Sequence, residues 1–250
     1  MSDRVILPDA AAVAQTAADR FVALARSACA ARGRFTVALS GGSTPKAMLA
    51  RLVDQPIEWT RVHVFWGDER CVPPDHADSN YRMACDALLN HVPIPPANVH
   101  RLAGELDPAL AARQYEAELR SVFGTVDWPR FDLIWLGLGT DAHTASLFPG
   151  TGAIHEQRRW VIGHFVEKLQ AQRLTLTPPV INQAEQVIFL VTGADKAAAL
   201  QSVWSHTPID PDRLPAQIIR PVAGTLTWLI DRAAAAQLAT SKLVTHGTAS

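Results

Sequence analysis

The amino-acid sequence predicts a three-layer α/β sandwich built on a mainly parallel sheet. Short apolar runs typical of buried strands alternate along the chain with longer segments whose apolar residues recur at helical spacing. A polar or glycine-containing turn follows three of these apolar runs. Parallel strands are joined by helical crossovers and are covered on both faces, so the alternation favours helices on both sides of one sheet.

Length and composition are those of one globular unit. The chain has 250 residues, 48% of them hydrophobic, and a mean hydropathy of +0.05. We expect a single domain over residues 1–250, because no linker, repeat or low-complexity tract interrupts it. The formal net charge of −1 and the absence of clustered Lys and Arg argue against nucleic-acid binding. No apolar run reaches the roughly 18 residues of a membrane helix, so no membrane partner is expected.

The cysteines and histidines form no disulfide or metal pattern. Cys29, Cys71 and Cys85 are odd in number and lack C-x-x-C spacing, and the N-terminus lacks the apolar core of a secretory signal. We therefore expect reduced thiols in a cytoplasmic protein. His155 and Glu156 open like a zinc-protease motif, but Arg159 stands where a second His is required, so no metal is expected.

Helices and strands alternate through the first half of the chain. Residues 9–31 are alanine-rich with one apolar face, and Asp9 and Gly33 are placed to cap the start and end of this helix. The other predictions are a strand at 35–39, a polar turn at 40–44, a helix with Pro45 in its first turn, a strand at 62–66, a loop at 67–78, a helix from Ser79 or Asn80, and a helix from Asp107-Pro108 to about Phe123.

The second half continues the pattern and completes a Rossmann-like arrangement. Phe131 to Leu136 is the most apolar run and reads as a central strand. The further predictions are a strand at 160–166, a short extended segment at 174–177, a strand at 186–191, a helix from about Asp195 to Trp204, a strand at 226–230, an alanine helix at 231–239 capped by Asp231, and frayed residues at 241–250.

The strongest candidate site follows the central strand. Gly137 and Gly139 form a glycine turn, and Asp141 and His143 come next, two residues apart. Ligands of open α/β sheets bind at the carboxyl ends of strands, and His is suited to proton transfer near neutral pH. The G-x-G-x-x-A pattern of residues 137–142 also matches a dinucleotide fingerprint. Gly150 and Gly152 leave no room for the long helix that this fingerprint requires, so we reject it.

A second candidate is S-G-G-S-T-P-K, residues 40–46, between a strand and a helix. Backbone N–H groups around Gly41 and Gly42, the helix N-terminus, and the hydroxyls of Ser43 and Thr44 could hold an anion. An ordinary glycine turn with a helix cap explains the same residues equally well. The spacing excludes a Walker A motif.

Two weaker candidates carry charge. Asp68 and Arg70 follow the strand at 62–66, where Asp68 could orient a base and Arg70 could stabilise negative charge; in isolation a solvated turn is the better interpretation. Arg173 and Lys196 could each bind a phosphate, although such residues usually lie on the surface.

Together these stretches resemble the 6-phosphogluconolactonase family over nearly the whole chain. The resemblance rests on six ordered blocks: A-L-S-G-G-S-T-P-K (38–46), F-W-G-D-E-R with V-P-P-D-H-A-D-S-N-Y (65–81), L-G-L-G-T-D-A-H-T-A-S-L-F-P (136–149), R-L-T-L-T-P-P-V-I-N (173–182), F-L-V-T-G-A-D-K-A (189–197) and L-P-A-Q-I-I-R-P-V-A-G (214–224). It implies hydrolysis of 6-phospho-D-glucono-1,5-lactone to 6-phospho-D-gluconate in the oxidative pentose phosphate pathway. The implied fold is that of glucosamine-6-phosphate deaminases and ribose-5-phosphate isomerases.

The resemblance also implies roles for the candidate residues. It assigns the substrate phosphate to Ser43, Thr44, Arg173 and Lys196. His143 is then the general base on water, and either Asp68 or Asp141 orients it, which the sequence leaves open. Arg70 and backbone N–H groups are candidates for stabilising the oxyanion. No cofactor or metal is required, and we expect a monomer or a weak homo-oligomer whose partner is the sugar-phosphate substrate.

One residue departs from the family pattern, and three other functions compete. The family commonly has D-G-H where this chain has Ala142, which is strained if the position needs a positive φ. A deaminase would carry a glutamate at the end of this block, where Phe148 stands here and cannot act as acid or base. A non-catalytic sugar-phosphate-binding protein would need neither His143 nor Asp68. A nicotinamide-binding protein is the remaining alternative.

Overall fold

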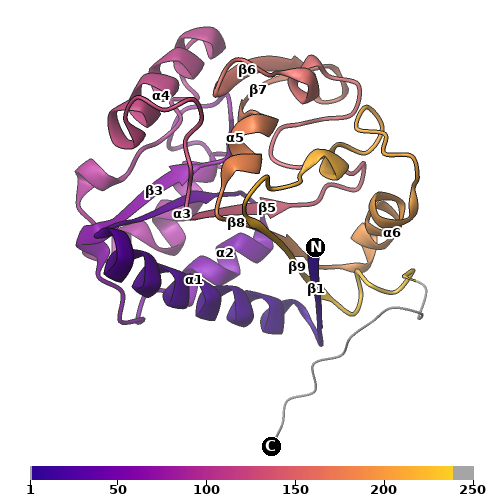
Figure 1. Ribbon diagram of the computed structural model, residues 1–250, viewed down its shortest axis with the longest axis horizontal. Coiled ribbons are helices and arrows are strands. Elements are labelled where there is room, and N and C mark those ends of the chain that lie inside the picture. Colours follow the sequence, from indigo (N-terminus) through magenta and orange to yellow (C-terminus); the bar gives the residue numbers. More distant parts are fainter. Residues whose placement is uncertain (1, 239–250) are drawn as a thin grey trace, which may run out of the picture.

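A six-stranded, fully parallel sheet forms the centre of the computed structural model, which describes residues 2–238 (Figure 1). Every neighbouring pair of strands runs in the same direction. The strand order is β1 (Ser2–Leu7), β9 (Thr225–Asp231), β8 (Gln186–Val191), β5 (Leu133–Gly137), β2 (Phe35–Leu39) and β3 (Val62–Trp66). The predicted α/β class with a mainly parallel sheet is confirmed.

Helices cover both faces of this sheet. In Figure 1, α1 (Ala10–Arg32) and α2 (Ser43–Ala50) lie below the sheet, whereas α4 (Pro108–Phe123) and α5 (Pro178–Gln183) lie above it. Two shorter helices complete the set, α3 (Asn80–Ala87), which packs on α2, and α6 (Ala197–Ser205). None of the helices in the described residues is long and apolar enough to cross a membrane.

The helix starts lie where the capping residues predict them. The Asp9 carboxylate accepts a hydrogen bond from Ala12 N at 2.8 Å, and Gly33 ends α1 in the left-handed region with φ 75°. Ser79 caps α3, and Asp107 caps α4 directly before Pro108. These boundaries are set by contacts within one helical turn, which is why the local sequence is sufficient to find them.

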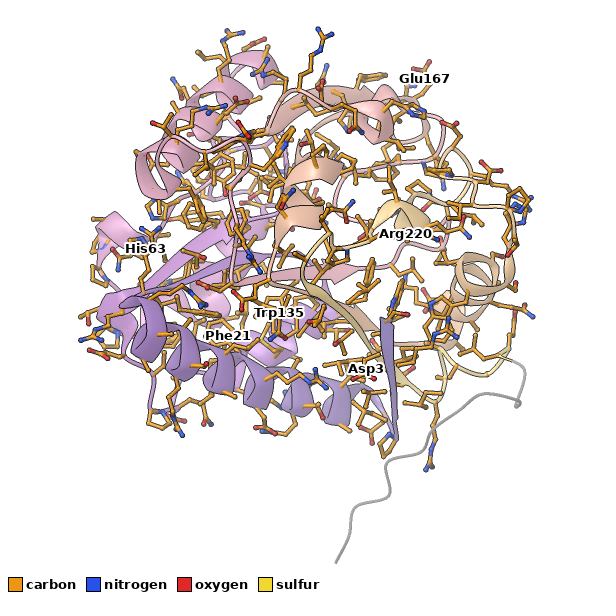
Figure 2. All side chains as sticks on the ribbon, in the orientation of Figure 1. Asp3, Phe21, His63, Trp135, Glu167 and Arg220 are labelled. Carbon is orange, nitrogen blue, oxygen red and sulfur yellow. The ribbon has the colours of Figure 1, made fainter. Side chains whose placement is uncertain are left out.

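The core lies between α1 and the parallel sheet and continues on the sheet's other face. Phe21 of α1 packs edge-on against Phe35 of β2, with 5.2 Å between the ring centroids. Figure 2 shows Phe21 and Trp135 inside the molecule, whereas Glu167 lies at its periphery. Trp135 and Phe21 are fully buried, as the apolar patterning of their segments predicts.

A second sheet of three antiparallel strands was not predicted. It consists of β4 (Asp68–Arg70), β7 (Ala171–Leu176) and β6 (Val161–Val166), in that order. The prediction of a loop at 67–78 is therefore wrong for its first residues, because D-E-R has no alternating apolar pattern and becomes a strand only through its pairing with β7. The segment predicted at 174–177 is the end of β7.

Three more predictions need correction. The strand β1 at the N-terminus and the short helix α5, which begins with two prolines, were missed. The predicted alanine helix at 231–239 is wrong over the described residues, which form turns after β9. The Asp231 carboxylate does accept a hydrogen bond from Ala234 N at 2.7 Å, but it also accepts from Gly193 N, so it joins two loops instead of starting a helix. Residues 239 and 241–250 lie outside the described part.

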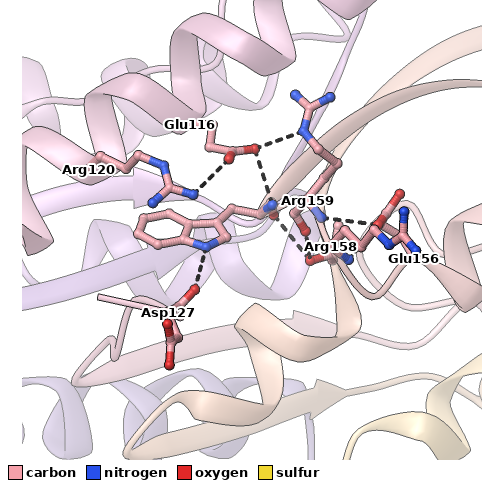
Figure 3. A network of polar contacts seen from close by, with 8 residues as sticks. Glu116, Arg120, Asp127, Glu156, Arg158 and Arg159 are labelled. Carbon is pink, nitrogen blue, oxygen red and sulfur yellow. Dashed lines mark hydrogen bonds and ion pairs between the residues drawn. The ribbon is translucent and has the colours of Figure 1, made fainter. Parts of the chain in front are cut away.

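A polar network ties α4 to the antiparallel sheet. Figure 3 shows the Glu116 carboxylate between Arg120 and Arg159. It accepts hydrogen bonds from Arg120 Nη2 at 3.0 Å, and from Arg159 Nε and Trp160 N at 3.2 Å each. The Arg120 guanidinium also lies 4.0 Å from the centroid of the Trp160 ring. One carboxylate thus fixes the helix to the entry of β6.

Candidate active site

The predicted site residues gather around two adjoining hollows of about 290 and 310 Å³. The hollows lie where β2, β3 and β5 of the parallel sheet end and the antiparallel sheet begins. Both are lined by Asp68, Arg70, His143 and Ala145. The glycine turn after β2 lies on one side of His143, and the end of the antiparallel sheet lies on the other.

The imidazole of His143 is held by Asp141. His143 Nδ1 lies 2.5 Å from Asp141 Oδ1, and the ring stacks on Phe148 with 4.1 Å between centroids. Nε2 has no hydrogen-bond partner within the described residues. The hydrogen bond from His143, opposed by burial and aided by Lys168, holds the pKa of the Asp141 carboxyl well below its usual range. Of the two carboxylates that the sequence left open, Asp141 is thus the one that contacts His143.

Position 139, beside His143, has no room for a side chain larger than that of glycine. A Cβ atom on Gly139 would lie 2.0 Å from His143 Nδ1, and Gly139 N donates to His143 O at 2.9 Å. Ala142 has φ 64°, so the position does adopt the left-handed conformation in which alanine is strained. No helix occurs in residues 138–151, in agreement with the rejection of the dinucleotide fingerprint.

Asp68 lies across the hollow from this turn without a hydrogen bond to His143. Its side chain is buried, and its Oδ2 accepts a hydrogen bond from Ser146 Oγ at 2.8 Å. Its backbone oxygen accepts from Asn80 Nδ2 at 3.0 Å. The neighbouring Glu69 is buried with it, and its carboxylate accepts from the backbone N–H groups of Asn80 and Tyr81, so it fastens β4 to the start of α3.

Arg70 and Arg173 form a pair of uncompensated cations. They face each other in the register of β4 and β7, and neither has a carboxylate oxygen within 4.0 Å among residues 2–238. Their guanidinium groups donate to backbone oxygens, of Asp78 at 2.5 Å and of Gln172 at 3.0 Å. Burial first, and then the charge of Arg70, lowers the pKa of Arg173. A bound anion would relieve both effects.

The glycine turn after β2 supplies the other wall, together with Lys196. Gly41, Gly42 and Lys196 line the smaller hollow. A Cβ on Gly41 would lie 1.9 Å from Asn80 Oδ1, so only glycine fits between the turn and α3. The side chains of Ser43 and Thr44 line neither hollow, and the Thr44 hydroxyl lies 2.6 Å from Thr192 Oγ1 instead.

Three residues of the site were missed in the sequence. Asn80 and Ser146 bind the backbone and the carboxylate of Asp68, and Lys168 binds Asp141. Ser146 lies in the same block as His143, and Asn80 at a predicted helix start, so both could have been considered. Lys168 follows β6 with no motif around it, and only the folded chain brings it to Asp141. Within residues 2–238 no three His, Cys, Asp or Glu side chains are placed to hold a metal ion.

The comparisons with known proteins all point to the same family. The model of the family described as glucosamine-6-phosphate isomerases/6-phosphogluconolactonase matches residues 8–228. The chain is 43% identical over 237 residues to the 6-phosphogluconolactonase of Nostoc sp., covering 93% of this chain and 97% of the relative. It is 47% identical over 215 residues to that of Synechocystis sp., covering 84% and 88%.

A solved structure agrees. That of 6-phosphogluconolactonase from Trypanosoma brucei superposes with a TM-score of 0.84 at 30% sequence identity, covering 96% of this chain and 99% of that one. The residues matched by the family model include every turn that lines the two hollows. The chain therefore belongs to the glucosamine-6-phosphate isomerase/6-phosphogluconolactonase family.

Proposed function

We propose that the protein hydrolyses 6-phospho-D-glucono-1,5-lactone to 6-phospho-D-gluconate, with residues 1–250 acting as one domain and His143 as the general base. The observation that carries this proposal is an imidazole oriented by Asp141 between a glycine turn and two uncompensated guanidinium groups. The names of the two bacterial relatives, 6-phosphogluconolactonases at 43% and 47% identity, support the choice of substrate.

The reaction transfers a proton in two steps, first from water to His143 and then from His143 to the leaving ring oxygen. Water attacks the lactone carbonyl carbon, and His143 Nε2 takes the proton that the water loses. Asp141 accepts the Nδ1–H hydrogen bond and stabilises the imidazolium that forms. The electron pair of the carbonyl moves to its oxygen, near Arg70. It then returns as the bond from the carbonyl carbon to the ring oxygen breaks. The imidazolium protonates that leaving oxygen, and the new carboxylic acid loses its proton to solvent.

The substrate phosphate provides the tether that holds the carbonyl beside His143. It carries a charge of about −1.5 to −2 at neutral pH. Arg173 and Lys196 are its ligands in this proposal, and Arg70 faces the oxyanion. Ser43 and Thr44 act through the backbone N–H groups at the start of α2, since their hydroxyls do not line the hollows. Asp68 lies within the shared lining and would accept hydrogen bonds from sugar hydroxyls.

Stopped-flow hydrolysis of freshly generated lactone tests the proposal. The unmodified protein is expected to accelerate ring opening far above the spontaneous rate. His143→Gln keeps a polar side chain but removes the base, and kcat is expected to fall by about 10² to 10⁴. No acceleration by the unmodified protein would refute the proposed reaction. Full turnover by the variant would refute only the role of His143.

A deaminase is disfavoured by the residue that packs on the base. Phe148 stacks on His143 and presents no acid or base, and the only carboxylates that line either hollow are Asp68 and Asp141. Incubation with glucosamine 6-phosphate is therefore expected to release no ammonia above the level without protein.

A further inference from the structure

Lys168 lies at the tip of the hairpin between β6 and β7. It contacts the site, although it lies outside the six sequence blocks that resemble the lactonase family. The tip is a short turn, Glu167–Leu169, closed by Gln170 with φ 48°. Lys168 Nζ donates to Asp141 Oδ2 at 2.6 Å, while Asp141 Oδ1 is bound to His143. Lys168 and Leu169 also line the larger hollow.

We propose that Lys168 is a positioning residue, which shares the carboxylate of Asp141 with His143, so weakens the preference of that carboxylate for the protonated imidazole, and holds the hairpin against the catalytic turn. This inference rests on the proposed function of the same site. The contact with the carboxylate carries it, because the two oxygens of Asp141 are divided between a lysine and the base.

The physical effect of this division is on the charge that His143 feels. A carboxylate bound only to an imidazole stabilises the imidazolium strongly, and the base is then held protonated to higher pH. An ammonium on the second oxygen balances part of that negative charge and also repels a proton on the ring. Both effects favour the neutral imidazole, which is the form that can accept a proton from water.

Other charged side chains surround His143, but a substitution of Lys168 leaves them unchanged. They are Asp68 and Arg70 from β4, Arg173 from β7, and Lys196 from the turn after β8, all of which line the hollows that His143 lines. Asp68 binds Ser146, and Lys196 pairs with Asp195 at 3.0 Å. Lys168 forms a direct ion pair with Asp141, the carboxylate that binds His143. A substitution of Lys168 therefore removes this contact and leaves the other charged groups in place.

The activity test compares Lys168→Met with Lys168→Arg over about pH 5.5 to 8, where histidine titrates. Methionine keeps the length of the side chain without its charge. The Lys168 side chain is 63% exposed and such pairs contribute about 0–1 kcal/mol, so the acidic limb of kcat/KM is expected to move up by about half a pH unit. The loss of kcat/KM is then about threefold below the limb and small above it. Arginine is expected to restore the profile.

Glu167→Gln is the matched control, because Glu167 is exposed on the same turn and its side chain lines neither hollow. It changes the charge of the hairpin without touching Asp141, so the profile is expected to stay in place. An equal loss at every pH in Lys168→Met would show a merely structural role and overturn the proposal. A change in KM alone would make Lys168 a substrate ligand and overturn it as well.

A readout independent of activity separates this inference from the proposed function. The ring signals of His143 can be followed by NMR as pH is varied, with His143→Gln giving the assignment. Their midpoint is expected about half a pH unit higher in Lys168→Met than in the unmodified protein. An unchanged midpoint refutes the role of Lys168 even if the lactonase activity is confirmed. A shifted midpoint without lactonase activity refutes the proposed reaction alone.

Discussion

Gly139 decides whether the base and its carboxylate can meet. A methyl group at this position would lie 2.0 Å from His143 Nδ1 and 2.8 Å from Asp141 Oδ1. Gly139→Ala is therefore expected to push the imidazole out of line while keeping every titratable group. Displacement of a reacting group by about 1 Å costs on the order of 100-fold in rate, so kcat is expected to fall by roughly that factor in the lactone assay.

Gly152→Ala is the matched control for this substitution. A Cβ at Gly152 meets no atom within 4 Å, and its φ lies outside the left-handed region. We expect its kcat to equal that of the unmodified protein. Normal turnover in Gly139→Ala would mean that the contact of His143 with Asp141 is not needed for the chemistry.

At this scale the sequence predicts what is local and misses what is brought together by folding. Asp141 and His143 are two residues apart after a strand, so their closeness could be expected, although the sequence left open whether Asp68 or Asp141 orients the imidazole. The strain at Ala142 could be expected from its place in the motif. The contact of Lys168 with Asp141 joins residues 27 apart in sequence through a hairpin of the second sheet, and no local pattern encodes it.

At the scale of elements, the Glu116 network holds α4 on the antiparallel sheet. The Glu116 side chain is only 13% exposed and accepts three hydrogen bonds, two from arginines and one from Trp160 N (Figure 3). Burial raises the pKa of Glu116, but these three bonds outweigh it and lower the pKa below the usual range. Glu116→Gln removes the buried charge that the two half-exposed guanidinium groups and Trp160 N bind, and we expect unfolding free energy to fall by about 1–3 kcal/mol in urea titrations.

Glu58→Gln provides the exposed counterpart. Glu58 forms an ion pair with Arg61 at 2.9 Å, but both side chains are about half exposed. Exposed pairs contribute about 0–1 kcal/mol, so this variant is expected to unfold close to the unmodified protein. Equal losses of unfolding free energy in Glu116→Gln and Glu58→Gln would show that burial of the carboxylate does not determine its contribution to stability.

The edge strand β3 carries a histidine that makes stability depend on pH. His63 Nδ1 lies 3.1 Å from His100 Nε2, and His100 Nδ1 lies 2.6 Å from Glu118 Oε1. Burial first, and then the charges of His100 and Arg34, lowers the pKa of His63. The unfolded chain then binds more protons at the pH where unfolded histidine titrates, about 6.5, so stability falls as pH drops below that value.

His63→Gln keeps a hydrogen-bonding side chain and removes this titration. Its loss of unfolding free energy between about pH 7.5 and 5.5 is expected to be smaller than that of the unmodified protein. The exposed His91, which lies 3.0 Å from the Asp86 backbone oxygen, gives His91→Gln as the matched substitution at an exposed histidine. A steeper acid loss in His63→Gln would contradict the assigned direction.

The elements that the sequence predicts and misses differ in where their partners lie. The starts of α1, α3 and α4 depend on a cap within three residues and were found. The strand β4 has only three polar residues and pairs with β7 about a hundred positions away, so it was interpreted as a loop. The strand β1 pairs with β9 at the other end of the described chain, which no local pattern can indicate.

At the scale of the whole molecule, the site lies where two sheets meet. The parallel sheet supplies the glycine turn and His143, and the antiparallel sheet supplies Asp68, Arg70 and Arg173. The sequence predicts the strand at 160–166 and the extended segment at 174–177, but it does not predict β4 or the antiparallel sheet that the three strands form. The common site at the carboxyl ends of the strands stays a prediction, and half of the wall around it comes from the sheet that the sequence did not indicate.

The pairing of β1 with β9 extends to the site through Asp231. Asp231 ends β9, is 5% exposed, and accepts hydrogen bonds from Gly193 N at 3.0 Å and Ala234 N at 2.7 Å. Gly193 O in turn accepts from Lys196 N at 3.1 Å, so this carboxylate anchors the turn that carries Lys196. The end of β9, the strand next to the edge strand β1, thus positions a wall of the hollow.

Asp231→Asn tests this connection between the end of β9 and the Lys196 turn, where we propose that the phosphate binds. The amide keeps the size of the side chain but loses the charge that the N–H groups of Gly193 and Ala234 bind. We expect unfolding free energy to fall by about 1–3 kcal/mol. KM for the lactone is expected to rise more than kcat falls, because a phosphate contact acts in the ground state and the transition state alike. Arg232→Gln, at the exposed neighbouring position, is expected to change neither value. A destabilised Asp231→Asn with an unchanged KM would show that the Lys196 turn is held by other contacts.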